Sequence, residues 1–237
     1  GIFGELKTLP IAEAHAIGLA AGLAKGGFKP VVAVYSTFLQ RGYDQIIHDV
    51  CLQNLPVVIC LDRAGLVGED GPTHHGVFDI SYLRHIPNLV VMAASTPAEL
   101  EEMLEFAIDL NRPVAIRYPK GSAPSALSAA PRPPIELGEA EILKNGMDLA
   151  IISVGSMLST ALKVADILSK NKVETTVINA RFITPLDEEL LGNILRDIKK
   201  EVTLEEGVLE GGFGSAVLEF MERENIRDVR VRRIGLP

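Results

Sequence analysis

Short, continuous runs of valine, isoleucine and leucine constrain the fold of this chain more than any other feature. In the first half of the chain they cover residues 31–34, 57–61, 89–92 and 114–116. Because these runs are apolar at consecutive positions and do not alternate with polar residues, both faces of each strand should be buried, as in a parallel sheet. The stretches between them favour helices over residues 12–24, 39–54 and 97–110. The sequence therefore predicts the α/β class.

A segment rich in proline, serine and alanine, residues 121–137, interrupts this pattern, because its composition sustains neither a helix nor a central strand. We interpret it as a linker between a first domain, residues 1–120, and a second domain, residues 138–237. In the second domain, strands are expected over residues 149–154, 175–178, 202–205 and 229–234. Helices are expected there over residues 157–169, 187–199 and 214–223. The predicted architecture is two open, mainly parallel-sheet α/β domains with helices on both faces of each sheet.

The charge and hydropathy of the chain exclude several classes of function. Of its 237 residues, 23 are Lys or Arg and 31 are Asp or Glu, which gives a formal net charge of −8. Binding to nucleic acid through phosphates needs a surplus of clustered cations, so no nucleic acid partner is expected. No apolar run approaches the roughly 18–20 residues that cross a bilayer, and no export signal is recognisable at the N-terminus. We therefore expect a cytoplasmic protein without a membrane partner.

The segment of residues 63–76 follows the second predicted strand and collects many chemically active side chains. It holds four glycines, one proline, one arginine, two acids and two histidines. Ligands of open α/β sheets bind beyond the C-terminal ends of strands, which favours a functional loop. An ordinary surface excursion would explain the glycines, but not the gathering of Arg63, Asp70 and His74. The adjacent His74 and His75 lack the spacing of a metal site, so we expect no protein-ligated metal and assign His74 to hydrogen bonding or proton transfer.

Glu13 lies in the first turn of the first predicted helix, among alanine, glycine and leucine residues. In one interpretation, its carboxylate interacts with the partial positive charge of the helix N-terminus. In the other, the carboxyl is partly buried and faces a ligand, because small apolar neighbours surround it. The two interpretations differ mainly in how deeply the side chain is buried, and the sequence leaves both open.

Several ordered segments, taken together, are similar to the signatures of one enzyme family. They read Ile-Ala-Glu-Ala-His-Ala from Ile11, Tyr-Ser-Thr-Phe-Leu-Gln-Arg-Gly-Tyr-Asp-Gln from Tyr35, Asp-Arg-Ala-Gly-Leu-Val-Gly-Glu-Asp-Gly-Pro-Thr-His from Asp62 and Arg-Tyr-Pro-Lys-Gly from Arg117. Further matches lie at residues 181–187, 205–207, 211–215 and 235–237. With these motifs the chain resembles the 1-deoxy-D-xylulose 5-phosphate synthase family of transketolase-like thiamine diphosphate enzymes.

The resemblance implies an enzyme that condenses pyruvate with glyceraldehyde 3-phosphate and releases carbon dioxide, at the entry to isoprenoid, thiamine and pyridoxal synthesis. Residues 1–120 would be the pyrimidine-binding domain, and residues 138–237 the C-terminal transketolase domain. The family holds Mg²⁺ and the cofactor diphosphate through a Gly-Asp-Gly motif in a further, N-terminal domain. No Gly-Asp-Gly occurs in this sequence. The resemblance therefore implies that a missing domain of the same enzyme binds them, that this chain alone is inactive, and that the enzyme is a homodimer.

The resemblance also implies roles for individual side chains. Glu13 matches the glutamate that hydrogen-bonds the aminopyrimidine of thiamine diphosphate and favours its imino tautomer. Phe38 matches the residue that stacks on the pyrimidine ring, and Arg41 matches a residue that lines the same pocket. His74 and Asp70 match loop residues beside the reacting carbons, where a histidine hydrogen-bonds or protonates a developing alkoxide. Glu13, His74 and Asp70 are thus the catalytic candidates.

Glyceraldehyde 3-phosphate carries a dianionic phosphate, which fixed cations and hydroxyl donors bind best. Tyr35, Arg63 and Lys120 match the phosphate-binding positions of the family, and Arg117 lies near enough in the sequence to contribute. Arginine is common in the family at the position of Lys120, and lysine keeps the charge but loses the bidentate guanidinium. These four residues are the substrate-binding candidates.

One departure and three alternatives bear on this interpretation. Before Ile11 the family reads Asp-Val-Gly, whereas this chain reads Lys-Thr-Leu-Pro. Together with the missing domain, this indicates an incomplete or trimmed chain. A β subunit of a 2-oxo acid dehydrogenase and a split transketolase subunit would share the fold and the glutamate. The third alternative is a noncatalytic assembly module, although scaffolding requires none of Glu13, Phe38 or His74.

Overall fold

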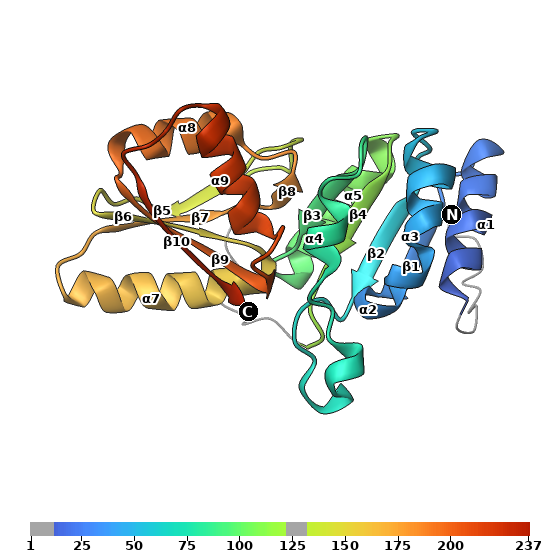
Figure 1. The fold of residues 1–237 in the computed structure, drawn as a ribbon, viewed down its shortest axis with the longest axis horizontal. Coiled ribbons are helices and arrows are strands. Elements are labelled where there is room, and N and C mark those ends of the chain that lie inside the picture. Colours follow the sequence, from blue (N-terminus) through green and yellow to red (C-terminus); the bar gives the residue numbers. More distant parts are fainter. Residues whose placement is uncertain (1–11, 122–131) are drawn as a thin grey trace.

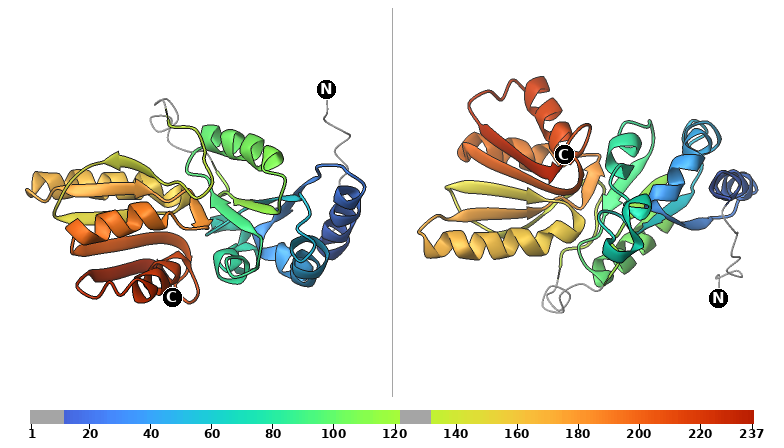
Figure 2. Two further views of the ribbon diagram at one scale, coloured as in Figure 1. Left: turned by 90° about the horizontal axis from the view of Figure 1, so that it is seen from above. Right: turned by 60° about the horizontal axis from the view of Figure 1, so that its bottom comes forward.

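The computed structural model describes residues 12–121 and 132–237. Residues 1–11 and 122–131, which include most of the predicted linker, lie outside the described part of the chain. The described residues form two lobes that lie side by side, each built on a five-stranded sheet (Figure 1). Two further views show the same separation into lobes (Figure 2). The predicted α/β class with two mainly parallel sheets is confirmed.

The first sheet has four parallel strands, in the spatial order β1 (Val31–Tyr35), β2 (Val58–Asp62), β4 (Val114–Arg117) and β3 (Val90–Ala93). The side chains of β3 and β4 are buried at every position, as their continuous apolar runs predict. A fifth strand, β8 (Phe182–Thr184), pairs antiparallel with β3. The sequence analysis assigned no strand to β8, because so short a segment has no periodic signal. The second half of the chain therefore completes the sheet of the first half.

Helices cover both faces of the first sheet. α5 (Pro97–Asp109) packs on one face, and α1 (Glu13–Lys25) and α4 (Asp79–Leu83) pack on the other. The start of α5 is capped by the Thr96 side chain, which accepts a hydrogen bond from the main-chain N–H of Glu99, and Pro97 occupies the first turn. These local signals explain why the helix begins where the sequence predicts.

The helix expected over residues 39–54 has a different form in the structure. It begins at Ser36, ends at Cys51, and changes its hydrogen-bonding pattern along its length. Its parts are α2 (Ser36–Leu39), a 3₁₀ turn (Gln40–Gly42), α3 (Tyr43–Gln45) and a π-helical turn (Ile46–Cys51). At Gly42 the segment lies close against α1, because a Cβ there would be 3.2 Å from Ile17 Cγ1. This contact explains why glycine occupies the position.

The second sheet has the strand order β10-β9-β6-β7-β5. Its strands are β5 (Glu141–Lys144), β6 (Leu149–Ser153), β7 (Thr175–Asn179), β9 (Lys200–Val208) and β10 (Arg230–Leu236). All run parallel except β5, an edge strand that the sequence analysis did not predict. α7 (Leu158–Lys170) covers one face, and α8 (Glu188–Asp197) and α9 (Phe213–Arg223) cover the other (Figure 1).

One hydrophobic core continues from lobe to lobe. It joins Ile80 and Leu83 of α4 to Val154, Phe213 and Val217 of the second lobe. The contact between the lobes is therefore a packed interior and not a flexible hinge of linker residues alone. Within the described ranges, no helix combines the length and the apolar character that a membrane crossing requires.

Candidate functional site

Most of the predicted site residues lie at the C-terminal edge of the first sheet. Tyr35 is the last residue of β1, Asp62 is the last residue of β2, and the two are partners in the parallel register. Arg63 follows Asp62 directly, and Lys120 lies just beyond the end of β4. Open α/β sheets bind ligands at this edge, because the C-terminal ends of parallel strands meet there.

The carboxyl of Glu13 is buried at the start of α1, with 7% of the residue exposed. Nη1 of Arg41 lies 3.4 Å and 3.5 Å from its two oxygens. No other side chain in the described part of the chain lies within hydrogen-bonding distance of this carboxylate. Because the two Arg41 contacts are long, the oxygens keep the capacity to accept a further hydrogen bond. The burial that the ligand-facing interpretation requires is present, and the ligand role itself stays a prediction.

Arg41 links Glu13 to a group of three rings. Its guanidinium carbon lies 5.1 Å from the centroid of the Phe38 ring. Tyr35 stacks on Phe38 with a centroid separation of 5.8 Å, and His74 meets Phe38 edge-on at 5.2 Å. The contacts thus run without a break from the buried acid to the long loop of residues 63–76.

Arg63 and Lys120 are both held by carboxylates. The Arg63 guanidinium carbon lies 3.8 Å from the Tyr35 ring centroid, Nη1 donates to Asp62 Oδ2 at 2.5 Å, and Nε donates to Asp70 Oδ2 at 3.1 Å. Nζ of Lys120 donates to Asp70 Oδ1 at 2.7 Å. The Asp70 carboxylate therefore bridges two of the residues that are predicted to bind phosphate.

The pKa values in this cluster follow from these contacts. The hydrogen bond from Lys120 and the one from Arg63 lower the pKa of Asp70 despite some desolvation. Burial alone would lower the pKa of Arg63, but the hydrogen bond to Asp70 and the charge of Asp62 outweigh it, and the pKa is raised. Each group is thus stabilised in its charged form.

The long loop is closed at its base by two main-chain hydrogen bonds between Gly65 and Gly76, at 2.7 Å and 2.9 Å. Higher in the loop, the neighbouring histidines have different partners. Nδ1 of His75 accepts the main-chain N–H of Val67 at 3.2 Å. His74, in contrast, lies against the ring group described above. The two imidazoles therefore serve different contacts, as expected for adjacent loop residues.

Arg117 is separate from the other predicted site residues. Its side chain is only 4% exposed, and Nε donates to Asp79 Oδ2 at 3.1 Å. Nη2 donates to the main-chain oxygen of Glu206 at 3.0 Å, and Asp79 also accepts a hydrogen bond from Ser36 Oγ at 2.9 Å. The guanidinium thus joins β4 to α4 and to the second lobe. Its part in phosphate binding stays a prediction that these contacts do not favour.

The sequence analysis did not single out Ser36, Asp79 or Glu206 as individual residues. Ser36 and Glu206 lie inside motifs that were identified, but Asp79 lies in none. A buried carboxylate that pairs with a guanidinium from another strand leaves no periodic signal, because the pairing depends on packing between segments that are distant in sequence.

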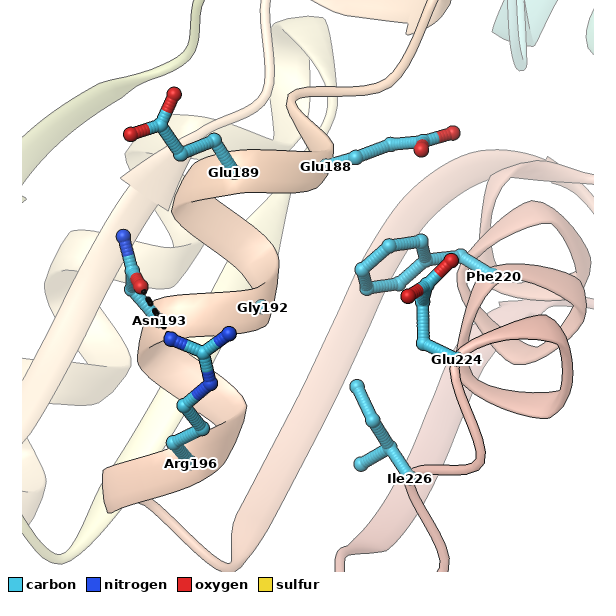
Figure 3. Close-up of a pocket in the computed structure, with 8 residues that line it drawn as sticks. All are labelled: Glu188, Glu189, Gly192, Asn193, Arg196, Phe220, Glu224 and Ile226. Carbon is cyan, nitrogen blue, oxygen red and sulfur yellow. Dashed lines mark hydrogen bonds between the residues drawn. The ribbon is translucent and has the colours of Figure 1, made fainter.

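Two surface hollows lie in the second lobe. The larger, about 350 Å³, lies between α8 and α9 and is drawn in Figure 3, where Arg196 hydrogen-bonds Asn193. It is lined by Glu188, Glu189, Gly192, Asn193, Arg196, Phe220, Glu224 and Ile226. The smaller, about 290 Å³, lies beside Thr176 and Ile198. No predicted site residue lines either hollow, so neither contributes to the candidate site.

Two known protein families match this chain, one over most of the first lobe and one over the second. The family "Transketolase, pyrimidine binding domain" matches residues 4–125, and "Transketolase, C-terminal domain" matches residues 138–237. The chain is 55% identical to a 1-deoxy-D-xylulose-5-phosphate synthase of Syntrophus aciditrophicus, over 95% of this chain and 35% of that protein. It is 50% identical to 1-deoxy-D-xylulose-5-phosphate synthase 1 of Geobacter sulfurreducens, over 100% of this chain and 38% of that protein. The chain thus spans little more than a third of the length of these curated relatives.

A solved structure shares both lobes. It is described as "Split gene transketolase, inactive beta4 tetramer" and is 30% identical to this chain. The TM-score is 0.87, and the match covers 95% of this chain and 73% of that chain. The similarity therefore includes the arrangement of the two sheets as well as each sheet alone.

Proposed function

Because the chain belongs to the transketolase family, we propose that it forms part of a thiamine diphosphate enzyme that condenses pyruvate with glyceraldehyde 3-phosphate. The products would be 1-deoxy-D-xylulose 5-phosphate and carbon dioxide. Relatives named for this synthase match nearly the whole chain, which supports the proposal. The observation that carries it is the continuous contact from Glu13 through Arg41 and Phe38 to His74.

The residues around Glu13 fit the pyrimidine end of the cofactor. The Glu13 carboxylate is buried and keeps acceptor capacity, so it would accept a hydrogen bond from a ring nitrogen. Phe38 would pack against the ring, and Arg41, whose side chain is 57% exposed, would line the same pocket. When bound, thiamine diphosphate supplies a nucleophilic carbon for attack on the carbonyl of a 2-oxo acid. This chain would orient the ring, and the Glu13 carboxylate would stabilise the proton on the ring nitrogen by accepting its hydrogen bond.

The loop side of the site fits a phosphorylated aldehyde. Arg63 and Lys120 would bind the phosphate, with the Tyr35 hydroxyl as a further donor. Both cations contact Asp70 in the structure, so the phosphate would compete with that carboxylate. His74 would donate a proton to the aldehyde oxygen as it becomes an alkoxide.

A domain outside this sequence would hold Mg²⁺ and the diphosphate, since the sequence has no Gly-Asp-Gly. Exposed apolar side chains lie on α1, on the edge strand β1 and in the segment between them, and they support the proposal of a partner domain and of a homodimer. They are Leu19, Leu23, Phe28 and Val31. Phe28 is the most exposed of them, at 64%.

The proposal is tested by adding the purified chain to the diphosphate-binding domain of a relative, with Mg²⁺ and thiamine diphosphate. We expect carbon dioxide release from pyruvate that glyceraldehyde 3-phosphate accelerates, with 1-deoxy-D-xylulose 5-phosphate as product. Glu13→Gln should abolish the reaction, whereas Glu102→Gln on the exposed side of α5 should not.

The same mixture, assayed in turn with lipoamide and with pairs of phosphosugars, distinguishes the alternatives. Turnover that depends on lipoamide would identify a 2-oxo acid dehydrogenase β subunit. Ketol transfer between phosphosugars without pyruvate would identify a split transketolase subunit, the alternative that the structural similarity favours. A complex that forms without any turnover would identify an assembly module.

A further inference from the structure

The base of the long loop is held between the two lobes. A Cβ on Gly76 would lie 2.5 Å from Cβ of Ser36, which belongs to the first lobe. A Cβ on Gly65 would lie 2.5 Å from the carboxyl carbon of Glu206, which belongs to the second lobe, and Gly65 also has a φ of +83°. Gly76 therefore has no room for a side chain, because the main-chain oxygen of Arg63 is as close as Ser36. At Gly65, a side chain would displace the Glu206 carboxylate and strain the backbone.

Glu206 makes contacts with both lobes. Its Oε1 accepts the main-chain N–H of Leu66 at 3.1 Å, and its Oε2 accepts the hydroxyl of Ser156 at 2.7 Å. Its main-chain oxygen accepts Nη2 of Arg117 at 3.0 Å. One residue of β9 thus binds the start of the loop, the turn before α7 and the end of β4.

We propose that Glu206 is a positioning residue for the acceptor site. By holding the base of the loop, it sets the location of Asp70 and His74, which the same loop carries. The inference rests on the proposed function, because that function assigns the roles of Asp70 and His74. All predicted catalytic and binding residues lie between Glu13 and Lys120, in the first lobe. Through Glu206, the second lobe would therefore contribute to the reaction by positioning the loop.

The contacts of the Glu206 carboxylate indicate that hydrogen bonding matters more than charge. Within the described residues, its side-chain partners are a main-chain N–H and a serine hydroxyl, both neutral. Glutamine can form both hydrogen bonds, because its amide oxygen can accept the main-chain N–H of Leu66 and its NH₂ group can donate to the Ser156 hydroxyl. Alanine can form neither hydrogen bond. Glu206→Gln and Glu206→Ala therefore separate positioning from an effect of charge.

The first test uses hydrogen exchange and does not depend on activity. In Glu206→Ala, we expect peptides that cover residues 64–76 to exchange about fivefold faster, since one net hydrogen bond at the loop base is lost. Glu206→Gln and a surface control, Glu222→Ala, should exchange like the unaltered chain. Equal exchange in Glu206→Ala and Glu222→Ala would overturn the proposal whatever the enzymatic activity of the chain.

The second test uses the complemented enzyme. In Glu206→Ala, we expect the KM for glyceraldehyde 3-phosphate to rise about tenfold while the KM for pyruvate changes less than twofold, because the loop lies on the acceptor side. Glu206→Gln should restore the acceptor KM. A loss in Glu206→Gln as large as in Glu206→Ala, or equal changes in both KM values, would overturn the positioning role. Failure of the unaltered chain to turn over would count against the proposed function and leave the exchange result to decide on Glu206.

Discussion

Arg181 and Glu99 form a buried ion pair between the two lobes, with Nε of Arg181 donating to Oε1 of Glu99 at 3.1 Å. Both side chains are at most 1% exposed. Arg132, which lies in the predicted linker, also reaches Glu99 at 3.2 Å and Glu141 at 3.2 Å. The linker is thus anchored by charge on its C-terminal side, where the sequence alone predicts only a connection.

We expect Glu99→Ala to destabilise both lobes together. The substitution leaves the buried guanidinium groups of Arg132 and Arg181 with Glu141 as their one remaining carboxylate partner in the described residues. Loss of a partner from a buried ion pair typically costs about 3–5 kcal/mol. Urea unfolding followed by circular dichroism would measure the loss. Glu101→Ala, an exposed change on the same helix, should cost less than about 0.5 kcal/mol. Equal stabilities of the two variants would show that the ion pair contributes little.

Glu201 gives the second lobe a pH-dependent stability. It is 1% exposed, and both carboxyl oxygens lack a hydrogen-bond partner within the described structure. Desolvation raises its pKa from the ordinary 4.5 to about 7. Between these two values the folded chain retains a proton that the unfolded chain releases, so the free energy of unfolding falls as the pH rises. Above about pH 7 the Glu201 carboxyl is ionised in both the folded and the unfolded chain. The folded chain then carries the full free-energy cost of burying the carboxylate.

Replacing Glu201 with glutamine removes this titration. We expect Glu201→Gln to match the unaltered chain near pH 4.5, where the carboxyl is largely protonated in the folded state, and to gain up to about 3 kcal/mol on it by pH 8. Urea unfolding at several pH values would test this. Parallel stability curves for the two proteins across that range would contradict the prediction.

Asp70→Asn should strengthen phosphate binding. The substitution keeps the shape of the side chain but removes the negative charge that now engages Arg63 and Lys120. We expect the affinity for inorganic phosphate to rise about threefold to tenfold, and the gain to shrink as salt is added. Calorimetric titration would measure it, with Glu69→Gln, an exposed change on the same loop, as the control. If Asp70→Asn has the same phosphate affinity as the unaltered chain, then the Asp70 carboxylate does not compete with phosphate for these cations.

His74→Ala should reduce turnover far more than folding. Loss of a proton donor typically lowers kcat about 100-fold or more. The imidazole is only partly buried, so the free energy of unfolding should change by less than about 1 kcal/mol. Steady-state kinetics of the complemented enzyme would measure kcat, and urea unfolding would measure the free energy of unfolding. An exposed histidine change, His48→Ala, serves as the control, and equal kcat values in the two variants would remove His74 from the reaction.

The local pattern of the sequence was sufficient for the fold class and for most element positions. The runs around β2, β3 and β4 predicted buried parallel strands because apolar residues at consecutive positions need cover on both faces. The cap at Thr96 placed the start of α5 for a reason that is equally local. The same strand ends predicted that the candidate residues would lie along one edge of the sheet, since parallel strands present their C-terminal ends there.

Only the tertiary structure decided which distant residues meet. β8 joins the sheet of the other lobe, Arg117 pairs with Asp79, and Glu206 reaches the base of the loop. Each of these contacts depends on packing between segments that are far apart in sequence, and a periodic pattern carries no information about such pairs. Periodicity reports which face of an element is buried, whereas the partner on that face is chosen by the shape and charge of the whole assembled interior.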